Sequence, residues 1–150
     1  MKKSLKILVP FDFSRYSQET LRFAISLKEA FEAEYLLLHV IPGGEVETFA
    51  TLGGESEEQR SRRLDEARAE LERVAQEVRQ EHPELKIEVR ASIGVPFKEI
   101  CRLADEESFQ LIVIGTHGRT GLSHLLIGST AERVVQHASC PVLSVKPKML

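Results

Sequence analysis

Residues 35–41 read YLLLHVI, an almost uninterrupted apolar run. The run lacks the alternation of a half-buried strand, and it is far shorter than the roughly 20 residues that a membrane-spanning helix needs. The pattern favours a strand covered on both faces, as in a parallel sheet. The runs LKILVP at 5–10 and LIVIG at 111–115 have the same character. We therefore expect Tyr35–Ile41, Leu5–Pro10 and Leu111–Gly115 to form the centre of a parallel sheet.

Two further runs complete the predicted sheet. Lys86–Ala91 alternates apolar and charged residues, which is typical of an edge strand, and Pro141–Val145 is the fifth strand. Helical periodicity fills the gaps, with predicted helices over Ser17–Ala33, Glu57–Glu81, Pro96–Ala104 and Ser129–Ala138. The apolar face of the first helix is predicted to include Phe31. Ser14 or Ser17 is predicted to cap the start of this helix. The alternating order of strands and helices predicts a doubly wound α/β fold.

Composition limits the classes of function. A chain of 150 residues is expected to form one domain, residues 1–150. Its net charge of −3, from 20 basic and 23 acidic residues, provides no positive field for nucleic acid. The two cysteines are too few for a disulfide scaffold, and the sequence shows no leader and no membrane span. We expect a cytoplasmic location, with neither nucleic acid nor membrane as a partner.

The segments that follow the predicted strands carry the candidate chemistry, because open α/β sheets bind ligands at the carboxyl ends of their strands. PFDFS follows the first strand at 10–14, and a glycine-rich stretch from Gly115 to Gly128 follows the fourth. Glycines let main-chain amides approach a phosphate, and the helix start at Ser129 adds unpaired N–H groups. Arg119 supplies a cation. The pattern predicts a phosphate-binding site.

Two common nucleotide motifs are absent from the sequence. No Gly-Lys-Ser or Gly-Lys-Thr occurs, which disfavours the P-loop mechanism. No G-x-G-x-x-G follows the first strand, which disfavours a dinucleotide site.

The spacing Gly115-x2-Gly118-x9-Gly128-Ser129, with Pro10-x-Asp12-x-Ser14 before it and Cys140-Pro141-Val142 after it, resembles the universal stress protein family. The likeness extends from Lys6 to Lys146 and matches the family's ATP-binding branch. It implies the strand order 3-2-1-4-5, with helices on both faces and ATP between the first and fourth strands. It also implies a homodimer through Pro141–Val145. The implied nucleotide contacts are Pro10, Phe11, Asp12, Ser14, Val40, Ile114, Gly115, His117, Gly118, Arg119, Gly128, Ser129 and Thr130.

Several alternatives stay open at this stage. Asp12 is either a ligand contact, to ribose, base or magnesium, or a turn former. His117 either touches phosphate or acts as a base, and no nucleophile stands beside it. We expect a stress-response module that binds ATP, ADP or AMP and switches in a homodimer. The alternatives are a slow ATPase and an interaction homodimer without nucleotide.

The remaining histidines and both cysteines are assigned structural roles. His39, His82, His124 and His137 lack metal-ligand spacing, so solvent or capping roles are expected. Cys101 is expected to be a small buried hydrophobe, and Cys140 begins the predicted dimer strand. The sequence leaves open whether residues 43–56 form a loop that closes over the ligand.

Overall fold

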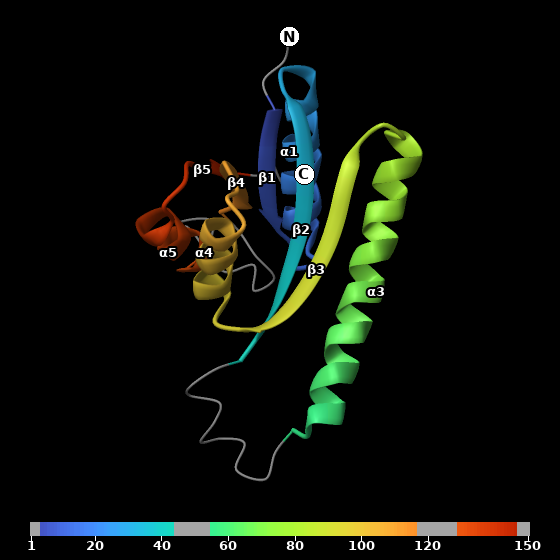
Figure 1. Cartoon of the computed structure of the whole chain (residues 1–150), viewed down its shortest axis with the longest axis vertical. Helices are drawn as coiled ribbons and strands as arrows, with labels where there is room; N and C mark the ends of the chain where they lie inside the picture. The colour runs from blue at the N-terminus through green and yellow to red at the C-terminus, as the bar shows by residue number, and fades with distance from the viewer. Residues whose placement is uncertain (1–3, 44–54, 117–128, 147–150) are drawn as a thin grey trace.

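A sheet of parallel strands forms the framework of the protein. The computed structural model describes residues 4–43, 55–116 and 129–146. Within them the sheet has five strands in the order β3-β2-β1-β4-β5, as the family resemblance implied. Figure 1 shows the sheet, whose strands are β1 (Ser4–Pro10), β2 (Glu32–Pro42), β3 (Lys86–Gly94), β4 (Leu111–Gly115) and β5 (Val142–Val145).

Helices cover both faces of the sheet. One face packs against α1 (Arg15–Ser26) and α3 (Glu57–Glu81), with Leu37 and Leu71 in its core. The other packs against α4 (Pro96–Glu106) and α5 (Ser129–His137), with Leu36 and Ile100 in its core. Figure 1 shows α4 and α5 together, well apart from α3. These two layers explain why the central strands are apolar throughout, as the sequence predicted.

The first helix is shorter than predicted. It begins at Arg15, because the Ser14 side chain accepts a hydrogen bond from the Ser17 amide and caps it. It ends at Ser26 and is followed by a 3-10 turn over Leu27–Glu29, so Phe31 is outside the helix. The reason is tertiary: Glu32, Ala33 and Glu34 pair in register with the first residues of β1, which requires extended backbone.

The ends of β3, β5, α4 and α5 also differ from the prediction. β3 continues to Gly94 because Ser92, Ile93 and Gly94 pair with the last residues of β2. β5 begins at Val142, although the carbonyl oxygen of Pro141 still accepts a hydrogen bond from the Ile112 amide at 3.0 Å. The predicted helix from Pro96 extends to Glu106, and the last helix ends at His137.

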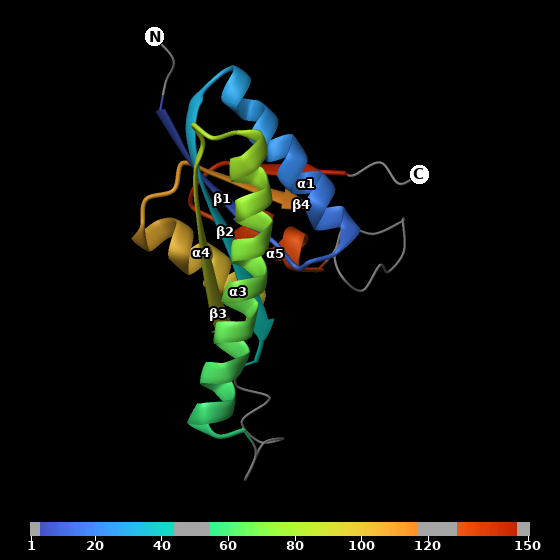
Figure 2. The ribbon, with the colours of Figure 1, turned by 90° about the vertical axis from the view of Figure 1, so that its right-hand side faces the viewer.

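Helix α3 matches its predicted bounds. Ser56 and Gln59 form a reciprocal capping box at its start. Ala67, Leu71 and Ala75 are its buried residues, so the heptad-like stripe packs against the sheet. Figures 1 and 2 show that its first turns project beyond the sheet, where residues 57–62 are exposed. Over the described ranges, no helix is both long and apolar enough to cross a bilayer.

Candidate nucleotide site at the carboxyl edge of the sheet

A tight turn links β1 to α1 at the carboxyl edge of the sheet. The Phe11 amide donates to the carbonyl oxygen of Leu38 at 2.8 Å, which extends the β1–β2 ladder by one residue. The Oδ1 atom of Asp12 then accepts hydrogen bonds from the Ser14 amide at 3.0 Å and the Ser17 hydroxyl at 2.9 Å. Asp12 therefore forms this turn through its Oδ1 atom, and its contact with a ligand stays a prediction.

Phe13 has an unusual backbone conformation within this turn. Its φ angle is 67°, in the left-handed region that residues other than glycine seldom adopt. Its ring packs edge-on against Phe11, with the ring centroids 5.4 Å apart, and lies 4.8 Å from the His39 ring. These contacts offset the cost of the left-handed backbone, on the order of 1–3 kcal/mol.

His39 of β2 is buried beside this turn, and its predicted solvent or capping role is wrong. The residue is only 8% exposed, and its Nδ1 atom lies 2.8 Å from the Phe11 carbonyl oxygen. One signal in the sequence pointed to this outcome. A polar residue inside the apolar run YLLLHVI must be buried, and a buried polar group needs a hydrogen-bond partner.

The residues expected to line the base site are divided between the two faces of the sheet. Val40 and Ile114 are buried on the face that packs against α4 and α5. Phe11 is buried in the core on the opposite face, below α1. Pro10 is half-buried and pairs in register with Leu38. The sheet therefore brings Pro10, Val40 and Ile114 together at its edge, whereas the Phe11 side chain packs into the core.

The phosphate end of the candidate site is described in part. Gly115 ends β4, and the next amide, of Thr116, donates to the Val145 carbonyl oxygen at 2.8 Å. Ser129 is exposed and Thr130 half-buried in the first turn of α5, which the buried residues Ala131 and Val134 anchor. The predicted contacts His117, Gly118, Arg119 and Gly128 lie outside the described residues, as does most of the 43–56 segment.

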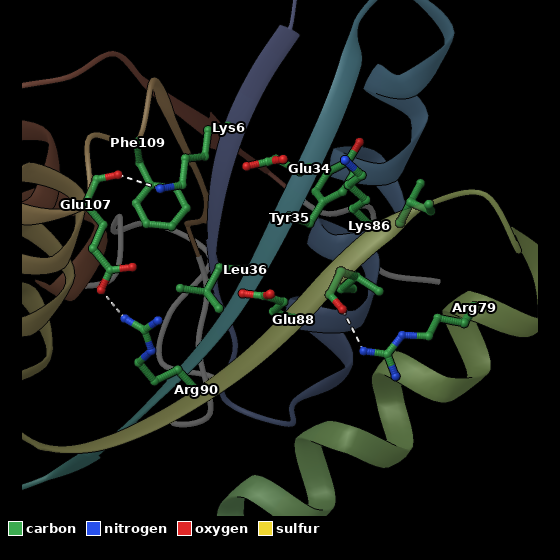
Figure 3. A pocket seen from close by; sticks show the side chains of 12 residues that line it. Lys6, Glu34, Tyr35, Leu36, Arg79, Lys86, Glu88, Arg90, Glu107 and Phe109 are labelled. Atoms are coloured by element: carbon green, nitrogen blue, oxygen red, sulfur yellow. Dashed lines mark hydrogen bonds and ion pairs between the residues drawn. The ribbon is translucent and has the colours of Figure 1, made fainter.

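A hollow lies at the opposite, amino edge of the sheet. This amino-edge groove, of about 450 Å³, is drawn in Figure 3. Its charged groups are mostly engaged within the protein. Arg90 pairs with Glu107, Arg79 donates to the Ile87 carbonyl oxygen at 2.6 Å, and Lys6 donates to the Glu107 carbonyl oxygen at 2.6 Å. The hydrogen bond from Arg90 lowers the pKa of the Glu107 carboxyl. Because Arg79, Arg90 and Lys6 are already engaged within the protein, the groove offers little to an anionic ligand.

The other histidines and the cysteines of the described segments have structural surroundings. His82 ends α3, and the His137 ring lies 5.3 Å from Phe97. Cys101 and Cys140 are half-buried against the core below α4 and α5, and burial raises the pKa of both thiols. Among the residues the structure describes, no His, Cys, Asp and Glu side chains gather as a metal site would require.

Comparison with known proteins identifies the family. The model of the universal stress protein family matches residues 4–146. The chain belongs to this family. Universal stress protein MJ0531 of Methanocaldococcus jannaschii is 39% identical over 142 residues, which cover 94% of this chain and 81% of that protein. Universal stress protein MJ0577 of the same organism is 31% identical over 156 residues, which cover 95% of each chain.

Solved structures of universal stress proteins share the fold. The structure of MJ0577 superposes with a TM-score of 0.78 at 32% identity, covering 97% of this chain and 98% of that one. A universal stress protein from Archaeoglobus fulgidus, solved in complex with dAMP, superposes with a TM-score of 0.62 at 24% identity. That superposition covers 97% of this chain and all of the other. At this lower identity the likeness concerns the fold.

Proposed function

We propose that this universal stress protein binds an adenine nucleotide, ATP in the first instance, at the carboxyl edge between β1 and β4. The observation that carries the proposal is the strand order. β1 lies between β2 and β4. The helix that follows β1 and the helix that follows β4 pack on opposite faces of the sheet, so the chain turns in opposite directions after these two strands. In doubly wound folds this topological switch point is where ligands bind. The turn at Asp12 and the end of β4 flank it.

The main chain of Val40 fits the edge of a base. The Leu38 carbonyl oxygen bonds to Phe11 of the neighbouring chain segment, so main-chain groups of Leu38 face β1. Alternate residues of a strand face the same neighbour, so the N–H and C=O groups of Val40 also face this side. Beyond Phe11 the chain turns away from β2. This leaves a donor and an acceptor directed to the switch point, a pair that matches the edge of adenine.

The phosphates would bind at the start of α5. This helix connects two parallel strands, so it runs against them and its amino end lies at the carboxyl edge. The amides of the first helical turn, which have no partner within the helix, and the hydroxyl groups of Ser129 and Thr130 suit an anion. We expect Gly115, Gly118 and Gly128 to admit the phosphates close to the main chain, with His117 and Arg119 beside them. Magnesium would arrive with ATP, held mainly by phosphate oxygens near Asp12.

The proposal also includes a cytoplasmic, stress-responsive homodimer. β5 is the outer strand on its side of the sheet, and the carbonyl oxygens of Pro141 and Val145 face β4. The main-chain groups of Val142 and Ser144 therefore face outward, where a second copy can pair with them. A protein that shares this fold has been solved in complex with dAMP, an adenine nucleotide. In this account nucleotide binding alters the dimer or a partner surface, and no catalytic group is assigned.

Two measurements test nucleotide binding. Native mass spectrometry of the purified protein should reveal a bound adenine nucleotide. After its removal, calorimetric titration with ATP should give saturable binding that Gly118→Ala and Gly128→Ala weaken at least tenfold, because a Cβ atom blocks close approach of the main chain. Gly43→Ala, outside the glycine motif, is the matched control and should bind as the wild type does. Wild-type affinity in both motif variants would refute the proposed phosphate site.

A further inference from the structure

We infer that His39 is a positioning residue for the nucleotide site, because its imidazole holds the Phe11 carbonyl group and so fixes the turn that presents Asp12. The ligand in this inference rests on the proposed function, whereas the turn does not. His39 lies in β2 and reaches the turn through space, from a part of the chain 28 residues away. It is one of three polar residues that the described segments bury almost completely.

The His39 imidazole binds the first main-chain carbonyl group beyond the end of the β1–β2 ladder. The Phe11 amide makes the last ladder bond, to the Leu38 carbonyl oxygen at 2.8 Å. In a continuing parallel ladder the Phe11 carbonyl would accept from the amide of Val40. Here its partner is the Nδ1 atom of His39 at 2.8 Å. The Phe11 carbonyl is therefore satisfied without the Val40 amide, and the chain is free to turn away from β2.

The same ring supports the strained residue of the turn. The Phe13 backbone has a φ angle of 67°, and its side chain packs on the His39 ring at 4.8 Å between centroids. His39 therefore contacts the turn on both sides of Asp12: at the carbonyl group before it and at the ring after it. Asp12 completes the turn through its bonds to Ser14 and Ser17. This arrangement fixes the direction in which the Asp12 carboxylate points.

The geometry specifies the tautomer of His39. A carbonyl oxygen only accepts hydrogen bonds, so the Nδ1 atom must carry the proton. Nitrogen-15 NMR of the ligand-free wild-type protein should therefore show a protonated Nδ1 in His39. A neutral ring protonated only at Nε2 would overturn the inference. This measurement needs neither a variant nor a nucleotide.

Two variants separate positioning from packing. His39→Phe keeps an aromatic ring on Phe13 but removes the donor, whereas His39→Asn places an amide N–H near the Nδ1 position. In the ligand-free protein, His39→Phe should speed hydrogen exchange of the Phe11 and Ser14 amides, and His39→Asn should restore much of their protection. His82→Phe, at the end of α3, is the matched control and should leave both amides unchanged. Equal exchange in His39→Phe and wild type would overturn the inference.

The effect on ligand is read from a double-mutant cycle with ATP. We expect His39→Phe to weaken binding by about fivefold to tenfold, the usual cost of one lost hydrogen bond. In an Asp12→Ala background the same change should have little further effect, since His39 acts through Asp12. If the effects of His39→Phe and Asp12→Ala on ATP affinity were fully additive, His39 would not act through Asp12. If the wild type binds no ATP, the proposed function fails, while the tautomer and the exchange rates still decide the role of His39.

Discussion

Tyr35 shows how burial at a single residue makes stability depend on pH. Its side chain is in the core, its hydroxyl donates to the Ala24 carbonyl oxygen at 2.7 Å, and burial raises its pKa to about 12. The unfolded chain has the ordinary pKa near 10, so the folded state holds the proton more tightly. The stabilisation is complete below about pH 10 and is lost as the pH rises toward 12. Urea unfolding at pH 8 and pH 11 should show this loss.

Tyr35→Phe provides the control for this prediction, because it cannot ionise. The difference in the free energy of unfolding between wild type and Tyr35→Phe should narrow or reverse sign between pH 8 and pH 11, while all other groups affect both proteins alike. A gap that stays constant over this range would contradict the burial of the Tyr35 hydroxyl.

The sequence predicted some features of the turn at Asp12 and not others. The motif around Asp12 located the turn, because aspartate and serine after an apolar strand form turns and caps. The left-handed backbone of Phe13 was not predictable, since no local signal assigns that conformation to phenylalanine. The bond from His39 to Phe11 joins residues on two strands, and such a pair becomes visible only when the strands are placed side by side.

Helix α3 illustrates how an element divides into a packed half and a projecting half. Leu71 is fully buried against the sheet, whereas Leu64 is half-buried in the projecting turns. Leu71→Ala should lower the free energy of unfolding by about 2–5 kcal/mol, because it leaves a cavity in a packed core. Leu64→Ala is the matched control and should cost much less. Equal losses in chemical denaturation would contradict this division of the helix.

The elements were predicted well wherever local periodicity decided them. α3 and β4 have their predicted bounds, since a long amphipathic stripe and a short apolar run between turn residues are strong signals. The errors fall where pairing between strands overrode local preference. Phe31 continued a helical stripe, but the register of β2 against β1 ended the helix before it. The charged residues of β3 concealed how far its pairing with β2 extends.

At the scale of the molecule, the strand order was implied by the family resemblance rather than by periodicity. Hydrophobic runs indicate how many strands exist, but many orders satisfy the same runs. The glycine spacing carried the family resemblance, the resemblance implied the order, and the structure confirms it. The contacts placed at His117, Gly118, Arg119 and Gly128 stay predictions, because they lie outside the described residues.

The proposed dimer gives a test at this scale. The main-chain groups of Ser144 face away from β4, so Ser144→Pro should remove an outward N–H and block pairing between two copies. Ser144→Ala keeps the N–H and should behave as the wild type. Sedimentation velocity should show a dimer for wild type and Ser144→Ala, and a monomer for Ser144→Pro. A dimer in all three proteins would place the interface elsewhere.

The central claim is that an adenine nucleotide binds at the carboxyl edge of the sheet and not in the amino-edge groove. Amide chemical shifts of the nitrogen-15-labelled protein, followed during titration with ATP, test it most directly. The account predicts saturable shifts at Asp12, Val40, Gly115 and Ser129, with Glu34 and Glu88 of the groove unchanged. Shifts confined to the groove, or a spectrum unaltered by millimolar ATP, would contradict it.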